Sequence, residues 1–122
     1  MNELLLQGLS ELGLDVSRAE TLERFSSLLL EKNEVMNLTA ITEPDAVAQL
    51  HLLDSAAILQ FVDLKGKKVV DVGTGAGFPG MPLRILKDDF DLTLLDSLGK
   101  RVHWLSEVCG ELQLKRVDCV HA

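Results

Sequence analysis

Residues 67–80, K-K-V-V-D-V-G-T-G-A-G-F-P-G, are the stretch that decides the fold. The β-branched pair Val69–Val70 begins an apolar run typical of a short buried strand, and Asp71 stands at its end. A helical pattern follows near Met81. Between strand and helix, the backbone can take positive φ and approach a ligand closely at three alternate glycines, Gly73, Gly75 and Gly77. Strand, glycine turn and helix together predict the first unit of a nucleotide-binding α/β fold.

The register of the glycines distinguishes two classes of cofactor site. A dinucleotide fingerprint, G-x-G-x-x-G, fits Gly75, Gly77 and Gly80, but it places Pro79 inside the phosphate turn. The other frame, D-x-G-x-G-x-G, begins at Asp71 and resembles the S-adenosylmethionine (AdoMet) site of class I methyltransferases. AdoMet has no pyrophosphate, and its ammonium and sulfonium favour a nearby carboxylate. The second frame therefore suits the sequence better, and a glycine turn without a ligand is the alternative interpretation.

Composition and cysteine spacing restrict the class of protein. A chain of 122 residues that is 47% hydrophobic indicates one globular domain or part of one. No apolar run approaches the ~18 residues of a membrane span, and the amino terminus lacks the basic segment of a signal peptide. Cys109 and Cys119 show no metal-site spacing. We therefore expect a cytoplasmic protein with reduced cysteines, no metal and no membrane contact.

The charge of the chain is unevenly distributed. The net charge is −7, and residues 1–61 carry ten acidic and three basic side chains, whereas residues 62–122 carry nine of each. This balance argues against binding nucleic acid through bulk electrostatics alone. Local basic patches would have to meet any polyanion, and solvated loops or helix ends are the alternative interpretation of those patches.

Helical periodicity runs through the first 61 residues. One helix is predicted over residues 3–13, and a second follows the capping box Ser17–Glu20. The second helix should end near Asn37 and bury an apolar face that comprises Leu22, Phe25, Leu28, Leu29, Val35 and Met36. A third helix is predicted from its cap, Thr42, to about Phe61. The pattern predicts a helical region over 1–61 and an α/β region over 62–122.

Polar residues at two further places are candidates for a site. His51 and Asp54 share a face of the third helix, so that their side chains can meet, although a solvated pair is the local interpretation. A second strand, Leu92–Leu95, ends at Asp96, 19 residues after Gly77. This is close to the ~20-residue spacing at which a carboxylate accepts hydrogen bonds from a ribose diol. Ser97 is predicted to cap the next helix, and a third strand covers residues 117–120.

Four motifs occur in order along the chain: N-L-T-A-I-T (37–42), H-L-L-D-S (51–55), D-V-G-T-G-A-G-F-P-G-M-P-L (71–83) and L-L-D-S-L-G-K-R-V (94–102). Together they resemble the glucose-inhibited division protein B family, the bacterial guanine-N7 methyltransferases of small-subunit ribosomal RNA. The resemblance covers nearly the whole chain. The combination of G-A-G-F-P-G with L-D-S-L-G-K-R is more specific than a general AdoMet motif.

The resemblance implies an α/β fold in which amino-terminal helices precede the first half of a Rossmann-like sheet, with about three parallel strands in the order 3-2-1. It implies AdoMet as the cofactor. Asp71 and the glycines would hold the methionine end, Phe78 would form a wall of the cleft, and Asp96 would bind the ribose.

The resemblance also implies an activity and a partner. The methyl group would be transferred to N7 of a guanine in 16S ribosomal RNA or the small ribosomal subunit. Guanine N7 carries no proton to remove, so we expect alignment and desolvation rather than a general base to supply the rate. His51 and Asp54 become candidates beside the cleft. Lys100 and Arg101 become candidates for RNA contacts, with a solvated pair at a helix start as the alternative.

One feature departs from the family. Its members are considerably longer and have seven strands in the order 3-2-1-4-5-7-6, whereas this chain stops at Ala122, after the third strand. Strand one would then have an unpaired edge, from which we expect self-association or a partner. A truncated, inactive fragment that acts as a binding or self-associating module is therefore an alternative function. A nicotinamide dehydrogenase fragment is a further alternative, which Asp71 disfavours.

Overall fold

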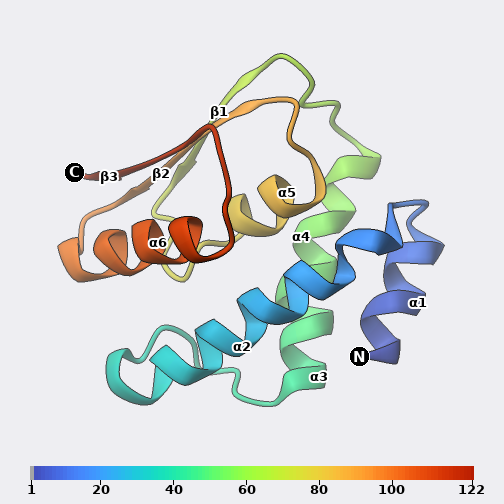
Figure 1. The fold of residues 1–122 in the computed structure, drawn as a ribbon, viewed down its shortest axis with the longest axis horizontal. Helices are drawn as coiled ribbons and strands as arrows, with labels where there is room; N and C mark the ends of the chain where they lie inside the picture. The colour runs from blue at the N-terminus through green and yellow to red at the C-terminus, as the bar shows by residue number, and fades with distance from the viewer. Residues whose placement is uncertain (1) are drawn as a thin grey trace.

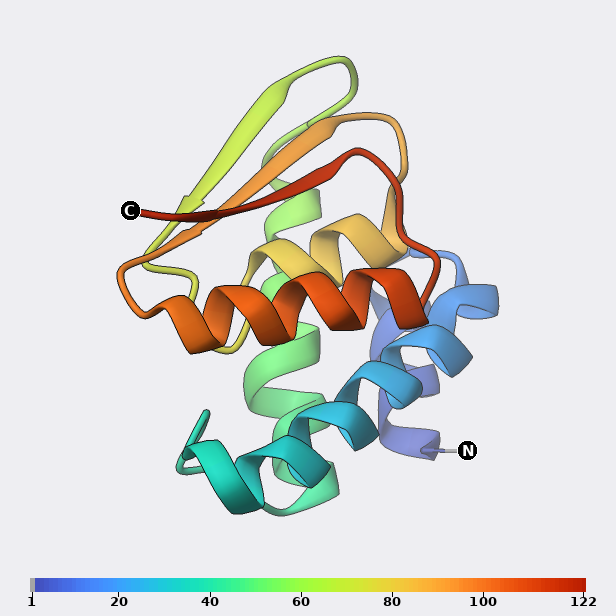
Figure 2. The same cartoon turned by 60° about the vertical axis from the view of Figure 1, so that its left-hand side comes forward.

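The computed structural model describes residues 2–122, in which a helical first half leads into alternating strands and helices (Figures 1 and 2). The first half contains α1 (Glu3–Glu11), the 3₁₀ turn η1 (Val16–Arg18), α2 (Ala19–Met36), α3 (Pro44–Val47), the π-helical segment η2 (Ala48–Leu53), α4 (Asp54–Ala57) and the 3₁₀ turn η3 (Ile58–Gln60). The second half contains β1 (Lys68–Val72), α5 (Gly80–Leu86), β2 (Asp91–Asp96), α6 (Gly99–Glu111) and β3 (Val117–His121).

The amino-terminal helices begin and end at residues with clear local roles. The Asn2 side chain accepts the Leu5 N–H at 3.0 Å and caps α1, and the chain turns at Gly13, where φ is 72°. The long helix α2 ends at Asn37, which takes the left-handed conformation (φ 51°, ψ 55°) that asparagine tolerates better than most residues.

The predicted serine and threonine caps are wrong. The residues in the cap positions of α2, α3 and α6 are Arg18, Glu43 and Leu98, and none of them makes a side-chain capping bond. At the first of these helices Asp15 accepts the Ser17 N–H at 2.9 Å and starts η1, so that the turn uses Ser17 before α2 begins. The helical segment therefore begins with a cap from the Asp15 carboxylate, where the sequence pattern predicted a cap from the Ser17 hydroxyl.

The segment from Pro44 to Gln60 forms the expected third helix, but it is not a uniform α-helix. Pro44 occupies its first turn, where the missing N–H costs nothing, and the middle of the segment is the π-helical η2. Such bulges shift the register of the side chains and often accompany functional sites. Here η2 contains His51, and its apolar residue Leu50 is 52% exposed.

Within the described residues the sheet has three parallel strands in the order β1-β2-β3, which confirms the predicted order 3-2-1. Each β-strand is connected to the next by a helix, and the central strand β2 pairs Leu92 with Val69 and with Val117. Side chains alternate along β1, so Val69 faces the helices, whereas Val70 is 56% exposed. The expectation that the whole run is buried is therefore wrong for Val70.

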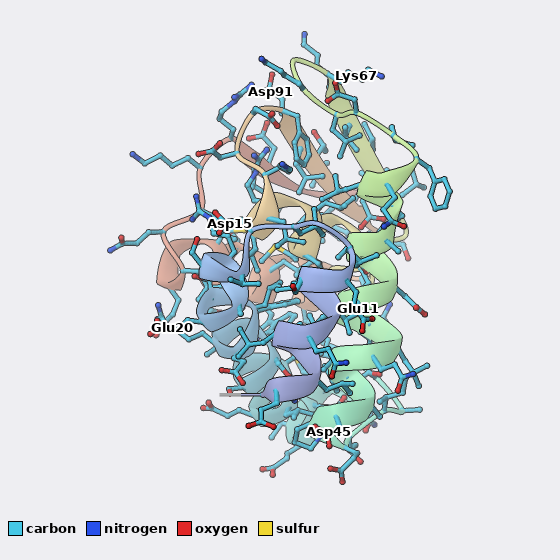
Figure 3. All side chains as sticks on the ribbon, turned by 90° about the vertical axis from the view of Figure 1, so that its right-hand side faces the viewer. Glu11, Asp15, Glu20, Asp45, Lys67 and Asp91 are labelled. Atoms are coloured by element: carbon cyan, nitrogen blue, oxygen red, sulfur yellow. The ribbon has the colours of Figure 1, made fainter. Side chains whose placement is uncertain are left out.

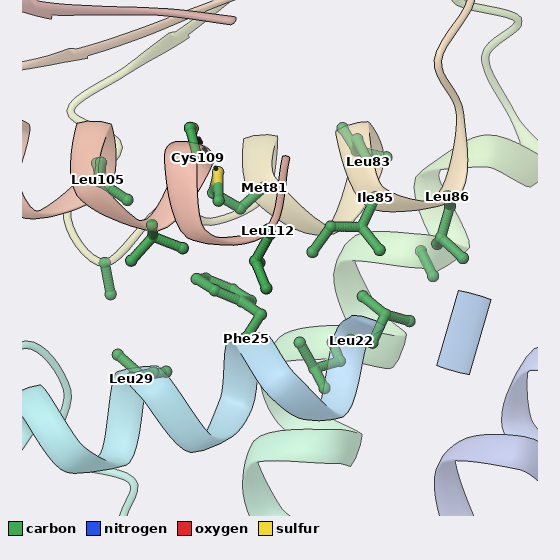
Figure 4. Close-up of a cluster of buried hydrophobic side chains, with 14 of the residues drawn as sticks. Leu22, Phe25, Leu29, Met81, Leu83, Ile85, Leu86, Leu105, Cys109 and Leu112 are labelled. Atoms are coloured by element: carbon green, nitrogen blue, oxygen red, sulfur yellow. Dashed lines mark hydrogen bonds between the residues drawn. The ribbon is translucent and has the colours of Figure 1, made fainter. Parts of the chain in front are cut away.

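The core lies between the sheet and α2. Figure 2 shows α5 and α6 on one face of the sheet, with α2 crossing below them. Figure 4 shows Phe25 of α2 pointing toward α5 and α6, in a cluster that also contains Leu22, Leu29, Met81, Leu105, Cys109 and Leu112. One continuous group of buried side chains thus joins the helical half to the α/β half. Val35, predicted to be on the buried face of α2, is instead 75% exposed.

Charged side chains lie at the periphery, as Glu20, Asp45 and Lys67 show at the edges of the view in Figure 3. None of the helices described between Asn2 and Ala122 is both long and apolar enough to cross a membrane. In the same part of the chain, no group of three or more His, Cys, Asp or Glu side chains is arranged to hold a metal ion.

Candidate cofactor-binding site

The glycine turn leaves β1 at the carboxyl end of the sheet, where ligands bind in open α/β folds. Its first anchor is the Thr74 N–H, which donates to the Leu95 carbonyl of β2 at 3.0 Å. The Thr74 carbonyl then accepts the N–H groups of Gly77 (2.9 Å) and Phe78 (3.1 Å), and this closes the turn. The sequence predicted the turn from its glycines, but it did not single out Thr74, the buried residue on which the turn is built.

Glycine is required in the turn for two different structural reasons. Gly73 (φ 68°) and Gly75 (φ 59°) face open space, because a Cβ built on either would have no atom within 4 Å. Gly77 instead faces the core, where a Cβ would lie 2.6 Å from Met81 Cγ and 2.9 Å from Leu105 Cδ2. The first two glycines therefore expose backbone to a possible ligand, whereas Gly77 allows close packing of the turn on α5 and α6.

Asp71, next to last in β1, holds the turn from one side. Its Oδ2 accepts both the Thr74 hydroxyl at 2.6 Å and the Gly80 N–H at 2.9 Å. Burial raises the pKa of Asp71, the bonds from Thr74 and Gly80 lower it in part, and the negative charge of Asp96 raises it further, to a net increase. The Asp71 carboxylate is thus fixed against the turn by one hydroxyl and one backbone N–H.

Asp96, the last residue of β2, holds the turn from the other side and is only 4% exposed. Its Oδ2 accepts the Gly75 N–H at 2.8 Å, and its Oδ1 accepts the Leu98 N–H at 2.9 Å. The second bond satisfies a donor at the start of α6, the role expected of Ser97. Burial raises the pKa of Asp96, but the bonds from Leu98 and Gly75 and the charge of Arg101 outweigh burial, so the net pKa is lowered.

The basic pair at the start of α6 separates in the structure. Arg101 Nη1 lies 3.6 Å from Asp96 Oδ1 with its side chain 36% exposed, so it joins the rim of the site. Lys100 is exposed on the same turn of the helix. The RNA contacts expected of both remain predictions.

An aromatic stack connects the helical half to the turn. The His51 ring lies parallel to the Phe78 ring, with 4.4 Å between centroids and 12° between planes, and Phe78 also contacts Phe25 at 5.5 Å. His51 Nε2 is 2.9 Å from the Thr39 hydroxyl, which in turn accepts the Ile41 N–H. The sequence analysis identified His51 and Phe78 as separate candidates. Only Thr39, a polar residue between apolar neighbours, could have indicated that His51 has a partner here.

His51 and Asp54 do not pair as their spacing suggested. His51 bonds to Thr39 instead, and Asp54 is exposed. Burial lowers the pKa of His51, and the negative charge of Asp54 raises it only in part. The structure therefore places His51 against the turn through Phe78, and it leaves Asp54 as a charge in solvent beside it.

A parallel sheet with a glycine turn after β1 and a carboxylate at the end of β2 defines this chain as part of a Rossmann-like α/β domain. Residues 18–122 match the GidB family, described as rRNA small subunit methyltransferase G, and the chain belongs to this family. The family resemblance inferred from the four sequence motifs is confirmed.

Individual relatives agree with this assignment. The chain is similar to ribosomal RNA small subunit methyltransferase G of Lachnoclostridium phytofermentans, with 45% identity over 98% of this chain and 51% of the relative. It is similar to the protein of the same name from Alkaliphilus metalliredigens, with 49% identity over 97% of this chain and 51% of the relative. A third, from Clostridium botulinum (strain ATCC 19397 / Type A), is 47% identical over 80% of this chain and 41% of the relative. The chain spans about half the length of these relatives.

Proposed function

We propose that this chain supplies the AdoMet site of an enzyme that methylates N7 of a guanine in 16S ribosomal RNA. The methyltransferase family to which it belongs supports a cofactor of this type. The substrate would be the RNA of the small ribosomal subunit, in the cytoplasm. The chain covers about half the length of its relatives, and the activity proposed is that of the whole enzyme.

The observation that carries the proposal is the charge beside the open glycines. Asp71 Oδ2 accepts bonds from Thr74 and Gly80, and Asp96 Oδ2 accepts the Gly75 N–H, so both carboxylates are bonded to the turn that carries the open backbone at Gly73 and Gly75. A carboxylate pair attracts the ammonium and sulfonium of AdoMet and repels the pyrophosphate of a dinucleotide. Asp96 can also accept bonds from a ribose diol, but both cofactors carry that group, so the preference for AdoMet rests on the negative charge. The residues present therefore fit AdoMet better than a nicotinamide dinucleotide.

Each residue has a role in this proposal. Asp71 and the open backbone at Gly73 and Gly75 would hold the methionine end, and Asp96 would bind the ribose diol while it keeps the turn in place. Gly77 would set the close packing of the turn on the helices behind it. Phe78, fixed by its stack on His51, would form the wall of the cleft.

The chemistry then requires alignment rather than proton transfer. AdoMet, when bound, supplies an activated methyl group on a sulfonium sulfur. Guanine N7 already presents a lone pair, so the chain needs to orient the reactants and exclude water. His51 and Asp54 would lie near the cleft, and neither would serve as a general base. Arg101 and Lys100 would meet RNA phosphates at its rim.

Calorimetric titration with AdoMet tests the site, and two glycines form a matched pair of variants. Gly73→Ala and Gly66→Ala both place a Cβ at positive φ (68° and 73°) with nothing within 4 Å, so both should lose about 1 kcal/mol of stability. Only Gly73→Ala puts a methyl group where the ligand would lie. We expect it to weaken AdoMet binding about tenfold or more, and Gly66→Ala to leave binding unchanged.

The outcomes separate the alternatives. Equal losses in both variants would contradict a ligand at the turn, and preferential binding of NADH would favour the dinucleotide frame. No binding by the chain would support the interpretation of an inactive fragment. A protein of the relatives' full length should then be assayed for N7 methylation of small subunits that lack this modification. Failure there would overturn the proposed activity.

A further inference from the structure

Thr39 lies in the loop between α2 and α3 (Figure 1), and two hydrogen bonds hold it there. Its N–H donates to the side-chain oxygen of Asn33 in α2 at 2.7 Å, and its hydroxyl oxygen accepts the Ile41 N–H at 3.1 Å. The first bond fixes the loop to the preceding helix, and the second closes a short turn around the hydroxyl. The hydroxyl held in this way lies 2.9 Å from Nε2 of His51.

A count of donors and acceptors places the proton between Thr39 and His51. A hydroxyl has one hydrogen to donate and two lone pairs, and a neutral imidazole has one N–H and one bare nitrogen. One lone pair of Thr39 Oγ1 is used by the Ile41 N–H. Among the described residues, His51 Nε2 is the one acceptor that the Thr39 hydroxyl reaches. The hydroxyl hydrogen is therefore satisfied within the chain only when it points to a bare Nε2, which leaves the proton of the neutral ring on Nδ1.

The other two histidines of the chain have the opposite surroundings. Nε2 of His103 lies 2.9 Å from a carboxylate oxygen of Glu107, and Nε2 of His121 lies 3.0 Å from the Ser97 carbonyl oxygen. Ionised carboxylate and carbonyl oxygens can only accept a hydrogen bond, so each of these rings donates from Nε2. His51 alone of the three histidines faces a group that can donate to it. The same chain therefore contains two internal references for the protonation of His51.

The imidazole that Thr39 contacts is the ring that covers Phe78. The two rings are 12° from parallel with 4.4 Å between centroids, and Phe25 contacts Phe78 as well, at 5.5 Å and 52°. The Phe78 N–H is bonded to the Thr74 carbonyl, so this aromatic side chain leaves directly from the glycine turn. A hydrogen bond at Nε2 fixes the rotation of the imidazole about its Cβ–Cγ bond, and with it the surface against which Phe78 lies.

We propose that Thr39 is a positioning residue whose hydroxyl donates to His51 Nε2, holds the imidazole as its Nδ1–H tautomer flat on Phe78, and so fixes the wall of the cofactor cleft. Thr39 acts through His51 and needs no contact with a ligand. A wall that is held before the ligand arrives lowers the cost of ordering it on binding. The effect on binding rests on the proposed function, whereas the position of the proton is a property of the folded chain by itself.

The position of the proton can be measured on the unchanged chain. Two-dimensional ¹H–¹⁵N NMR of the imidazole nitrogens at about pH 8.5, where all three rings are neutral, distinguishes the two tautomers. We expect the proton on Nδ1 in His51 and on Nε2 in His103 and His121, within one spectrum. Thr39→Ser keeps the hydroxyl and should keep the His51 pattern, whereas Thr39→Val should lose it. A proton on Nε2 of His51 in the unchanged chain would overturn the proposal.

Calorimetric titration with AdoMet then measures the effect on the cleft, with circular dichroism as a check of folding. Thr39→Val should weaken binding about fivefold, and Thr39→Ser less than about twofold. Thr42→Val makes the same chemical change at an exposed position of the same loop and should leave binding unchanged.

A double-mutant cycle shows whether Thr39 acts through His51. In His51→Phe the new ring can still stack on Phe78 but has no Nε2, so adding Thr39→Val should weaken AdoMet binding by less than about twofold further. Equal weakening by Thr39→Val and Thr42→Val, or an undiminished effect of Thr39→Val in the His51→Phe chain, would overturn the positioning role. Absence of AdoMet binding by the unchanged chain would instead count against the proposed function, and the NMR measurement would still decide the role of Thr39.

Discussion

The two carboxylates beside the glycine turn should respond very differently to the same substitution. Asp71 accepts two hydrogen bonds at one oxygen, Oδ2, whereas Asp96 accepts its two backbone bonds at different oxygens. Asparagine has one carbonyl oxygen and one NH₂ group. In Asp71→Asn the amide oxygen can occupy the Oδ2 position and keep both bonds. In Asp96→Asn the NH₂ group must face either the Gly75 N–H or the Leu98 N–H.

The difference in stability between the two variants follows from the bonds that each carboxylate makes. Asp96→Asn loses one charge-assisted hydrogen bond, worth about 1.5–3 kcal/mol, and leaves a neutral bond in place of the second. The partly exposed pair with Arg101 adds no more than about 1 kcal/mol. We therefore expect Asp96→Asn to reduce the free energy of unfolding by about 2–4 kcal/mol. Asp71→Asn should cost less than about 1 kcal/mol, since burial already disfavours its charge.

Urea denaturation followed by circular dichroism measures both values, with the exposed Asp118→Asn as a control for the general loss of a charge. The pH dependence provides a second check. The pKa of Asp96 is lowered in the folded chain, so its ionisation stabilises the fold above the unfolded pKa of about 3.9. This contribution is lost as pH falls through the folded pKa. The difference between the parent chain and Asp96→Asn should therefore shrink below about pH 4.

Equal stability of the two asparagine variants at neutral pH would contradict the different bonding of Asp71 and Asp96. A loss of less than about 0.5 kcal/mol in Asp96→Asn would likewise mean that its two oxygens do not hold the turn. A stability difference that stayed constant down to pH 3 would contradict the assigned ionisation.

Three further predictions concern the fold and the stack. Gly80→Ala should unfold or strongly destabilise the chain, because its Cβ would collide with the Leu94 side chain and lie 2.9 Å from Asp71 Oδ2. Gly110→Ala, whose Cβ would have nothing within 4 Å, should instead stabilise α6 by up to about 1 kcal/mol. Thermal melts that show equal shifts for the two variants would contradict this. The pKa of His51 should lie below 6.5 in an NMR titration and fall further in Asp54→Asn, and a pKa at or above 6.5 would argue against its burial on the turn. The 122-residue chain should self-associate through the exposed edge of β1, detected by light scattering; a monomer at micromolar concentration would exclude this.

Much of the fold follows from local patterns in the sequence. Helical periodicity and Gly13 placed α1, and the helix predicted after Ser97 is α6, whose apolar residues Leu105 and Val108 are buried. The strand, the glycine turn and the carboxylates at positions 71 and 96 were also evident, since short-range residue type sets backbone conformation there. These features depend on neighbours a few residues away, which is why one sequence was enough.

Contacts between distant segments could not be read in this way. The caps predicted at Ser17, Thr42 and Ser97 were wrong. At the start of α6, for example, the Asp96 carboxylate accepts the Leu98 N–H in place of a serine cap. Val35 has the correct spacing to be buried, but it is 75% exposed because it lies at a hollow of about 360 Å³ between α2 and α6. A local sequence pattern indicates which conformation or environment a residue favours. It does not indicate which group from a distant segment will bond to it or cover it in the folded chain.

The sequence by itself determined the α/β class, the family and the positions of the turn and its acids. Tertiary structure alone decided how those acids are used, because Asp96 is held against Gly75 only when β2 lies beside β1. It also decided that His51 lies on Phe78, since helix α2 and the segment after it must fold back on the sheet before the two rings can meet. Backbone conformation is set by neighbours in the chain, whereas the chemistry of a site is set by groups that only folding brings together.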